Sequence, residues 1–157
     1  MKIDDLVIKR TIHAPLKQVW EAWTKPELIK GWWGPNGFTI PSIQMDFRVG
    51  GKFLNAMRSP EGKDYWSTGK ILEIQPMKRI VMTDSFADEK GNVILAGEYG
   101  MDGDWPEEML VTVNFEQDSP NTTSFTLVYA GIPDEENLKM AKASWNDMFD
   151  KLEAILK

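Results

Sequence analysis

The apolar and polar positions along the chain predict a strand, two short helices, a series of strands and one long helix. Residues 5–13 alternate between apolar and polar side chains, with only Arg10 interrupting the apolar side, which predicts a first strand. From Leu16 to Trp23 the apolar residues recur at helical spacing, directly after a proline that suits a first helical turn. A helix is therefore predicted to follow the first strand.

A second short helix is predicted directly afterwards, because Thr24 to Glu27 is a capping-box pattern and Gly31 ends the apolar stretch. Beyond it, short runs of β-branched and aromatic residues alternate with glycine- and proline-rich turns. These runs predict six strands, at about 38–46, 52–58, 64–74, 79–86, 108–117 and 122–131. Most connections between them are short, which favours an antiparallel meander.

The last stretch of the chain has the clearest pattern. From Leu138 to Ile155, apolar residues recur at every third or fourth position, and Asp134 stands where a helix cap belongs. A helix over residues 134–156 would be roughly 34 Å long, enough to cross a small sheet. We therefore predict an α+β fold in one domain, 1–157, with a curved antiparallel sheet of about seven strands wrapped around this helix.

The composition excludes several kinds of chemistry. The chain has 157 residues, a net charge of −6, no cysteine and one histidine, His13. No thiolate nucleophile or His-rich metal site can form, and His13 has no identifiable catalytic partner, so it is interpreted as a surface or capping residue. No basic stripe supports nucleic-acid binding. No apolar run could span a membrane and no signal peptide is evident, so a cytoplasmic protein without membrane insertion is predicted.

The connection before the fifth of these six strands is long and acidic. Residues 86–109 carry seven acids and one base, Lys90. Four of the carboxylates lie close together in the sequence, at Asp102, Asp104, Glu107 and Glu108. Such oxygens could hold calcium, but their spacing misses the EF-hand pattern. A solvated acidic loop is therefore favoured, and neither a metal nor a cofactor is predicted.

Two adjacent tryptophans, Trp32 and Trp33, stand between glycines where the second short helix ends. Such a pair can plug a core, cover a cavity or dock another protein. In the expected fold this segment enters the sheet near the open end of the space beneath the long helix. At least one of the two rings is therefore expected to border a cavity whose far wall includes Trp145 or Phe149.

Four segments carry a resemblance to a known family. They are "RTIHAPLKQVWEAWTKPELIKGWWGP" at 10–35, "FRVGGKF" at 47–53, "TGKILEIQPMKRIVMT" at 68–83 and "SWNDMFDKLEAIL" at 144–156. Together they resemble the Hsp90-ATPase-activator-homologue family of the START-like, helix-grip superfamily. The resemblance implies a helix-grip fold, with a cavity between the long helix and the sheet of the kind this superfamily uses for apolar or amphipathic small molecules.

The resemblance does not imply one activity, because the superfamily includes lipid carriers, hormone receptors, cyclases and co-chaperones. The eukaryotic co-chaperone has an additional N-terminal domain, whereas this chain begins almost directly at its first strand, which argues against chaperone activation. We therefore predict a protein that binds an apolar or aromatic small molecule. The alternatives are a cyclase- or hydrolase-type enzyme that uses a cavity carboxylate, and a co-chaperone-like interaction module. A homodimer is left open.

The candidate binding residues are large apolar side chains in elements that should face the cavity. They are Trp32, Trp33, Phe38, Met57, Trp66, Met82, Trp145 and Phe149. Arg48, Glu73 and Asp84 are candidates for polar groups that orient a ligand or abstract a proton. Strand alternation does not decide whether Glu73 and Asp84 face the cavity or water, because both sides of residues 65–72 mix polar and apolar residues.

Overall fold

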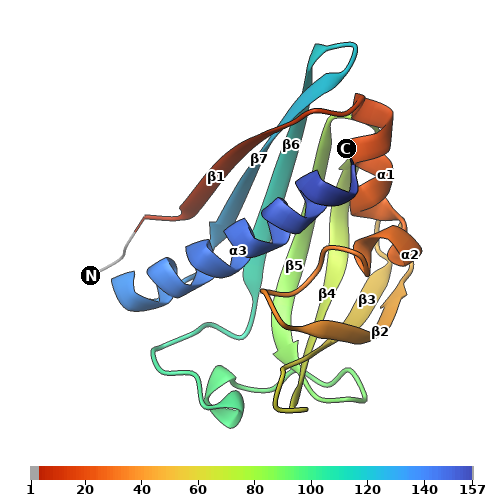
Figure 1. The fold of residues 1–157 in the computed structure, drawn as a ribbon. Coiled ribbons are helices and arrows are strands. Elements are labelled where there is room, and N and C mark those ends of the chain that lie inside the picture. Colours follow the sequence, from red (N-terminus) through yellow and green to blue (C-terminus); the bar gives the residue numbers. More distant parts are fainter. Residues whose placement is uncertain (1–3, 157) are drawn as a thin grey trace.

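The computed structural model, which describes residues 4–156, confirms the predicted fold class and the order of the predicted elements. Its elements are β1 (Leu6–Ile12), α1 (Leu16–Thr24), α2 (Pro26–Ile29), β2 (Thr39–Met45), β3 (Lys52–Arg58), β4 (Asp64–Gln75), β5 (Arg79–Ala87), η1 (Ala96–Tyr99), β6 (Met109–Ser119), β7 (Thr122–Ala130) and α3 (Glu135–Ile155). The strands form one antiparallel sheet in the order β1-β7-β6-β5-β4-β3-β2. The sheet curls around α3, and α1 and α2 lie beside the C-terminal end of that helix (Figure 1).

The register of the sheet shows which residues face α3. Met82 of β5 lies opposite Val111 of β6, and Val111 lies opposite Tyr129 of β7. Directly opposed residues share a face of the sheet, so alternate positions along these strands form its inner surface. The pairing of β4 with β5 shifts between Ile71 and Glu73, which marks a bulge. This bulge explains why alternation alone did not assign the faces of β4.

The long helix starts as its sequence predicts. The Asp134 side chain accepts a hydrogen bond of 2.9 Å from the Asn137 backbone N–H, which satisfies one of the free donors of the first turn. The capping box expected for α2 is wrong. Thr24 still belongs to α1, where its hydroxyl donates to the Trp20 carbonyl, and Lys25 precedes α2 without a side-chain cap.

A packed core fills the space between the sheet, α1 and the C-terminal half of α3. Its centre is a group of aromatic rings in mutual contact, with centroids 4.8 to 6.2 Å apart: Trp23, Trp32, Phe125 and Phe149. Trp32 and Phe149 have no exposed surface, and the Trp32 indole N–H donates to the Ala22 carbonyl at 2.9 Å. Aromatic rings packed in this way bury large apolar areas and make this end of the molecule dense.

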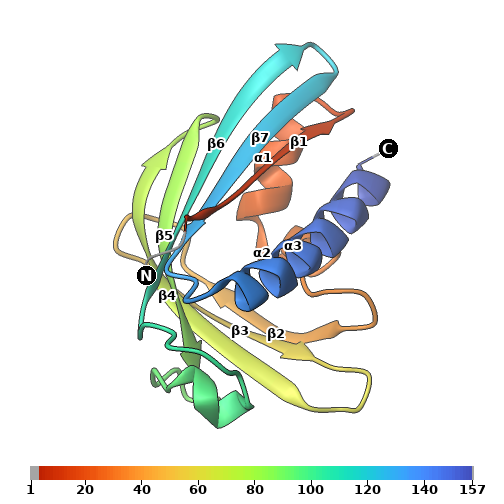
Figure 2. The same cartoon turned by 90° about the vertical axis from the view of Figure 1, so that its left-hand side faces the viewer.

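The acidic connection between β5 and β6 contains one short helical turn, η1, which the sequence analysis did not predict. Tyr99 in this turn accepts a hydrogen bond from the Trp66 backbone N–H and donates to the Ala87 carbonyl, so it links the connection to β4 and β5. Figure 2 shows that the connection lies below the sheet in this view. Its middle part returns to the N-terminal end of α3, where it contributes to the site described below.

Residues 4–156 contain neither a candidate membrane-spanning helix nor a candidate metal-binding cluster. No helix among them is long and apolar enough to cross a membrane. They also contain no group of three or more His, Cys, Asp or Glu side chains placed to hold a metal ion.

Candidate functional site

A cavity of about 370 Å³ lies between the inner face of the sheet and the N-terminal half of α3. A volume of this size is typical of small-molecule sites. Segments from across the chain line it: Trp33, Pro35 and Phe38 before β2, Met57 on β3, Tyr65, Trp66 and Ser67 on β4, Asp84, Ser85 and Phe86 on β5, Met101 and Trp105 in the acidic connection, Met109 on β6, Tyr129 on β7, and Asn137, Met140, Ala141, Ser144, Trp145 and Met148 on α3. Most of these side chains are aromatic rings or methionines.

The helix contributes one face to the cavity. Asn137, Ala141, Trp145 and Met148 are four, four and three residues apart in turn, and Ser144 lies three residues after Ala141, so these residues share one side of α3. Smaller side chains stand at Ala141 and Ser144, opposite the sheet. Trp145 and Met148 come further along the helix, closer to the packed core.

Trp33 packs against Trp145 in an edge-to-face arrangement, with ring centroids 5.3 Å apart, and both residues line the cavity. The next residue, Gly34, has a positive φ of 87°, and a Cβ there would meet the Phe38 Cβ at 3.1 Å. Its backbone N–H donates to the Met148 sulfur at 3.0 Å. Glycine at this position therefore allows the chain to turn tightly against α3, and this turn holds Trp33 at the cavity wall.

Asp84 is the only charged residue among the described residues that line the cavity. The Tyr129 hydroxyl donates a hydrogen bond of 2.6 Å to its carboxylate. Burial raises the pKa of Asp84 to about 6, although the hydrogen bonds from Tyr129 and from the Ser85 backbone act in the opposite direction. The pKa of Tyr129 is raised well above its ordinary value, first by burial and then by the neighbouring carboxylate. The pair places one charged group in a wall that is made mostly of apolar side chains.

The acidic connection closes one side of the cavity. Met101 and Trp105 line it, and the carbonyl of Asp102 between them accepts a hydrogen bond of 2.8 Å from the Asn137 side chain on α3. A Cβ at Gly103 would approach the Asn137 amide to 2.8 Å, so only glycine permits this close packing. The sequence analysis did not predict this wall. The apolar residues Met101 and Trp105 within an acidic loop were a signal that could have indicated it.

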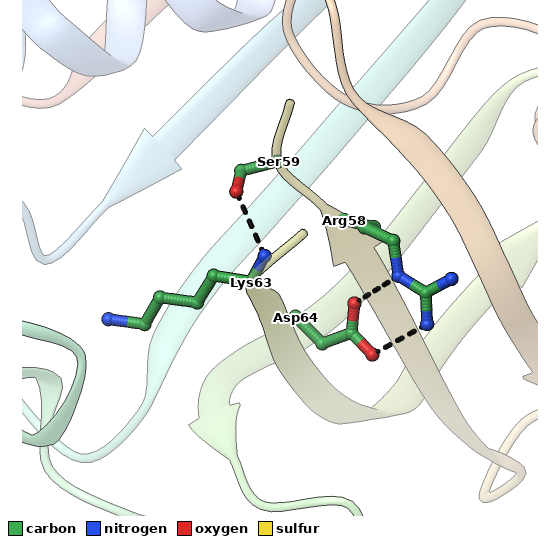
Figure 3. A network of polar contacts seen from close by, with 4 residues as sticks. All are labelled: Arg58, Ser59, Lys63 and Asp64. Carbon is green, nitrogen blue, oxygen red and sulfur yellow. Dashed lines mark hydrogen bonds and ion pairs between the residues drawn. The ribbon is translucent and has the colours of Figure 1, made fainter. Parts of the chain in front are cut away.

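The β3–β4 hairpin holds Tyr65 at the rim of the cavity. Figure 3 shows the paired hydrogen bonds from Arg58 to Asp64, of 2.7 and 3.1 Å, next to the bond from the Lys63 backbone N–H to the Ser59 hydroxyl. The hydrogen bonds between Arg58 and Asp64 raise the pKa of Arg58 and lower that of Asp64. The Lys63 ammonium lies 5.0 Å from the centre of the Tyr65 ring, within cation–π distance.

Several of the predicted site residues meet at this cavity. Trp33, Phe38, Met57, Trp66, Asp84 and Trp145 all line it. Trp66 pairs with Ala56 and Ala87, on the opposite side of the sheet from Tyr65, so we attribute its contact with the cavity to its backbone. Sequence reasoning did not select Phe86, Met109 and Tyr129, because the inner positions of β5, β6 and β7 follow from the register.

Four of the predicted site residues lie elsewhere. Trp32 and Phe149 belong to the packed core, because the chain turns at Gly34 only after Trp32 has been enclosed by α1. Arg48 is exposed and pairs with Asp46 at 2.7 Å. Glu73 follows the bulge of β4 and pairs with Arg79 at 3.2 Å on the surface, so the proposed role of these two charges in the cavity is corrected.

The predicted residue Met82 lines a small inner recess of about 30 Å³ rather than the main cavity. The recess shares Trp33, Asp84 and Trp145 with the main cavity. Its other lining residues are Trp23, Ile29, Met45, Phe53, Asn55 and Val111. Asp84 therefore stands where the two spaces meet.

The other polar candidates considered from the sequence lie outside both spaces. His13 is exposed and does not line either of them. The four clustered acids of the connection, Asp102, Asp104, Glu107 and Glu108, are also exposed. Asp102 takes part in the wall only through its backbone carbonyl, which accepts hydrogen bonds from Asn137 and Trp105.

Comparison with known proteins agrees with this architecture. The sequence profile of the family "Activator of Hsp90 ATPase homolog 1-like protein" matches residues 13–157, and the chain belongs to this family. A crystal structure from Chromobacterium violaceum superposes with a TM-score of 0.79 at 24% identity, covering 98% of each chain. One from Nitrosomonas europaea has a TM-score of 0.77 at 24% identity, covering 98% of this chain and 94% of that one.

A third crystal structure, from Silicibacter pomeroyi, is described as a protein of the same family. It has a TM-score of 0.77 at 20% identity and covers 97% of this chain and 96% of its own. At these identities the three structures establish the fold. The comparison with curated proteins finds none that matches this chain.

Proposed function

We propose that this is a cytoplasmic protein that binds an apolar or aromatic small molecule in the cavity between the sheet and α3. The observation that carries the proposal is the cavity itself, about 370 Å³ in volume and walled by aromatic rings and methionines on both sides. A cavity of this kind buries most of a small ligand, and flexible methionines adapt its walls to different shapes. A protein that acted only through its outer surface would not need such a space.

Native mass spectrometry of the purified protein tests this proposal. We expect a retained small molecule, or saturable binding of the neutral dye Nile red when the protein is purified without one. Trp145→Ala removes one wall of the cavity and should weaken dye binding. Val128→Ala on β7 is a matched control, because it alters the other face of the sheet. Absence of both a retained molecule and saturable dye binding would refute the proposal.

A second candidate function is acid–base catalysis, and the Asp84–Tyr129 pair favours it. A carboxylate with a pKa of about 6 can exchange protons near neutral pH, and the Tyr129 hydroxyl at 2.6 Å holds it in place. In this alternative, Asp84 removes a proton next to a ligand carbonyl. Deuterium exchange into 2-tetralone, an enolisable aromatic ketone, would show this activity.

The two candidates predict different results for Asp84→Asn. If the protein is an acid–base enzyme, the variant should lose catalysed exchange but keep Nile red binding. If it only binds ligands, wild type and variant should show the same slow exchange as buffer. Glu73→Gln is the matched control, because Glu73 is a carboxylate on the neighbouring strand that faces water.

A further inference from the structure

Two residues that line the inner recess, Trp23 and Asn55, each carry a buried polar atom without a partner among the described residues. The Asn55 side-chain oxygen and the Trp23 indole nitrogen make no hydrogen bond within the described chain, and both residues are only 3% exposed. The indole nitrogens of Trp32 and Trp105, in contrast, donate to backbone carbonyls. Leaving a buried donor or acceptor unpaired costs the full desolvation penalty of that group. Two such atoms on residues that line one small recess indicate that a polar group of a ligand binds there.

The two atoms have complementary hydrogen-bonding capacities. The indole N–H can only donate, whereas the Asn55 oxygen can only accept. A hydroxyl group both accepts and donates, so a hydroxyl in the recess can pair with either atom. The recess, at about 30 Å³, has room for one such small group. It joins the main cavity at Asp84, and a molecule in the main cavity could therefore extend a hydroxyl into it.

The charge of the walls argues against an anionic ligand. Among the described residues that line the two spaces, Asp84 is charged and none is Lys, Arg or His. Lys63 lies over the Tyr65 ring, and the Lys151 ammonium contacts the Trp33 carbonyl, but neither lysine lines either space. A carboxylate or phosphate would lose its hydration beside Asp84 without gaining a counter-ion. An ammonium group could pair with Asp84 but could not accept from the Trp23 N–H.

We infer that the cavity selects an uncharged apolar molecule with a hydroxyl group, and that this hydroxyl binds in the recess between Trp23, Asn55 and Asp84. This inference rests on the proposed function and specifies its ligand class. The apolar part of the molecule lies in the main cavity against Trp33 and Trp145. The recess thus sets the orientation of the ligand and distinguishes alcohols and phenols from acids of the same skeleton.

Three probes with one skeleton test the inference: 2-naphthol, 2-methylnaphthalene and 2-naphthoate, each competing with bound Nile red. We expect 2-naphthol to bind about tenfold more tightly than 2-methylnaphthalene, because its hydroxyl can pair with a buried polar atom of the recess. We expect 2-naphthoate to bind more weakly than either. Asn55→Leu should reduce the preference for 2-naphthol to below about threefold while 2-methylnaphthalene still binds. Asn114→Leu, the same change at an exposed position of β6, should leave the preference unchanged.

A spectroscopic measurement on the wild-type protein keeps the test independent of whether Asn55→Leu folds. The Trp23 indole N–H resonance, assigned with Trp23→Phe, should move further downfield with 2-naphthol than with 2-methylnaphthalene. Equal affinities of the two probes, an unchanged preference in Asn55→Leu or an indole resonance that does not distinguish them would overturn the inference while the cavity function stood. If none of the probes displaces Nile red and the dye itself does not bind, the proposed function fails as well.

Discussion

The two ends of α3 lie over the same curved sheet, but one end contacts a packed core and the other a cavity. Phe149 and Leu152, in the C-terminal half, have no exposed surface and pack among rings from α1 and the sheet. In the N-terminal half, Ala141 and Ser144 face the cavity. The difference follows from what lies opposite the helix, because α1 with its tryptophans fills one end and no α-helix of residues 4–156 is inserted at the other.

Adjacent residues fall on different sides of this boundary. Trp32 is fully buried and its indole N–H is paired, whereas its neighbour Trp33 is half-buried and lines both the cavity and the recess. The two rings still touch, with centroids 5.3 Å apart. The comparison indicates that one ring stabilises the fold and the other forms the site, and this division can be tested.

The largest expected effect is that of Trp32→Ala. The substitution removes a fully buried ring from the packed end, so it should lower the free energy of unfolding by about 3–5 kcal/mol. Urea denaturation followed by far-ultraviolet circular dichroism measures the loss. Trp33→Ala in parallel should cost clearly less, because the cavity already surrounds part of that ring. If Trp32→Ala and Trp33→Ala lowered the free energy of unfolding equally, the distinction between the packed core and the cavity would be contradicted.

Asp84→Asn should stabilise the folded protein by an amount that depends on pH. Burial raises the pKa of Asp84 from 3.8 to about 6. As the pH rises, the unfolded chain therefore loses this proton at a lower pH than the folded protein does. The free energy of unfolding of the wild type consequently falls between about pH 4 and 6. At pH 7 the variant should therefore be more stable by up to about 3 kcal/mol. At pH 4 the gain should nearly vanish.

Urea denaturation of the wild type and Asp84→Asn at both pH values measures this effect. Glu73→Gln, which changes an exposed carboxylate, should show no comparable gain. A gain that was the same at pH 4 and pH 7 would mean that ionisation of Asp84 is not its source.

Trp33→Ala should weaken binding in the cavity while the fold persists. Because the ring lies against Trp145 at the junction of the cavity and the recess, we expect Nile red binding to lose about 1–3 kcal/mol. Fluorescence titration of the dye gives the dissociation constant. Leu72→Ala, at an exposed apolar residue of β4, is the control. An unchanged affinity in Trp33→Ala would place the dye outside the cavity.

The smallest expected effect concerns the start of α3, which forms the edge of the cavity. Asp134→Ala removes the N-cap and a contact of 3.2 Å with the Asn137 side chain, so it should cost about 1 kcal/mol of stability. Thermal unfolding measures the cost, with Glu135→Ala in the first turn as the control. If the two variants unfold at the same temperature, the cap does not stabilise this end.

The sequence by itself determined the elements and the family. Alternation, helical spacing and glycine-rich turns are local signals, and they placed every strand within a few residues and identified α3 with its cap at Asp134. The same local patterns carried the resemblance that the family match confirms. They also favoured a position beside a cavity for at least one of Trp32 and Trp33, with Trp145 or Phe149 in the far wall, because the segment after Gly31 and the long helix must meet over one sheet.

Only the tertiary structure decided which side chains reach the cavity. Asp84 and Glu73 were equivalent candidates in the sequence, but the bulge in β4 and the register of β5 turn one inward and the other toward Arg79. Likewise, Trp32 and Trp33 differ by one position, and only the packing against α1 and the turn at Gly34 separates them. The facing of a side chain depends on pairing between distant segments, and such pairing leaves no mark in the local pattern.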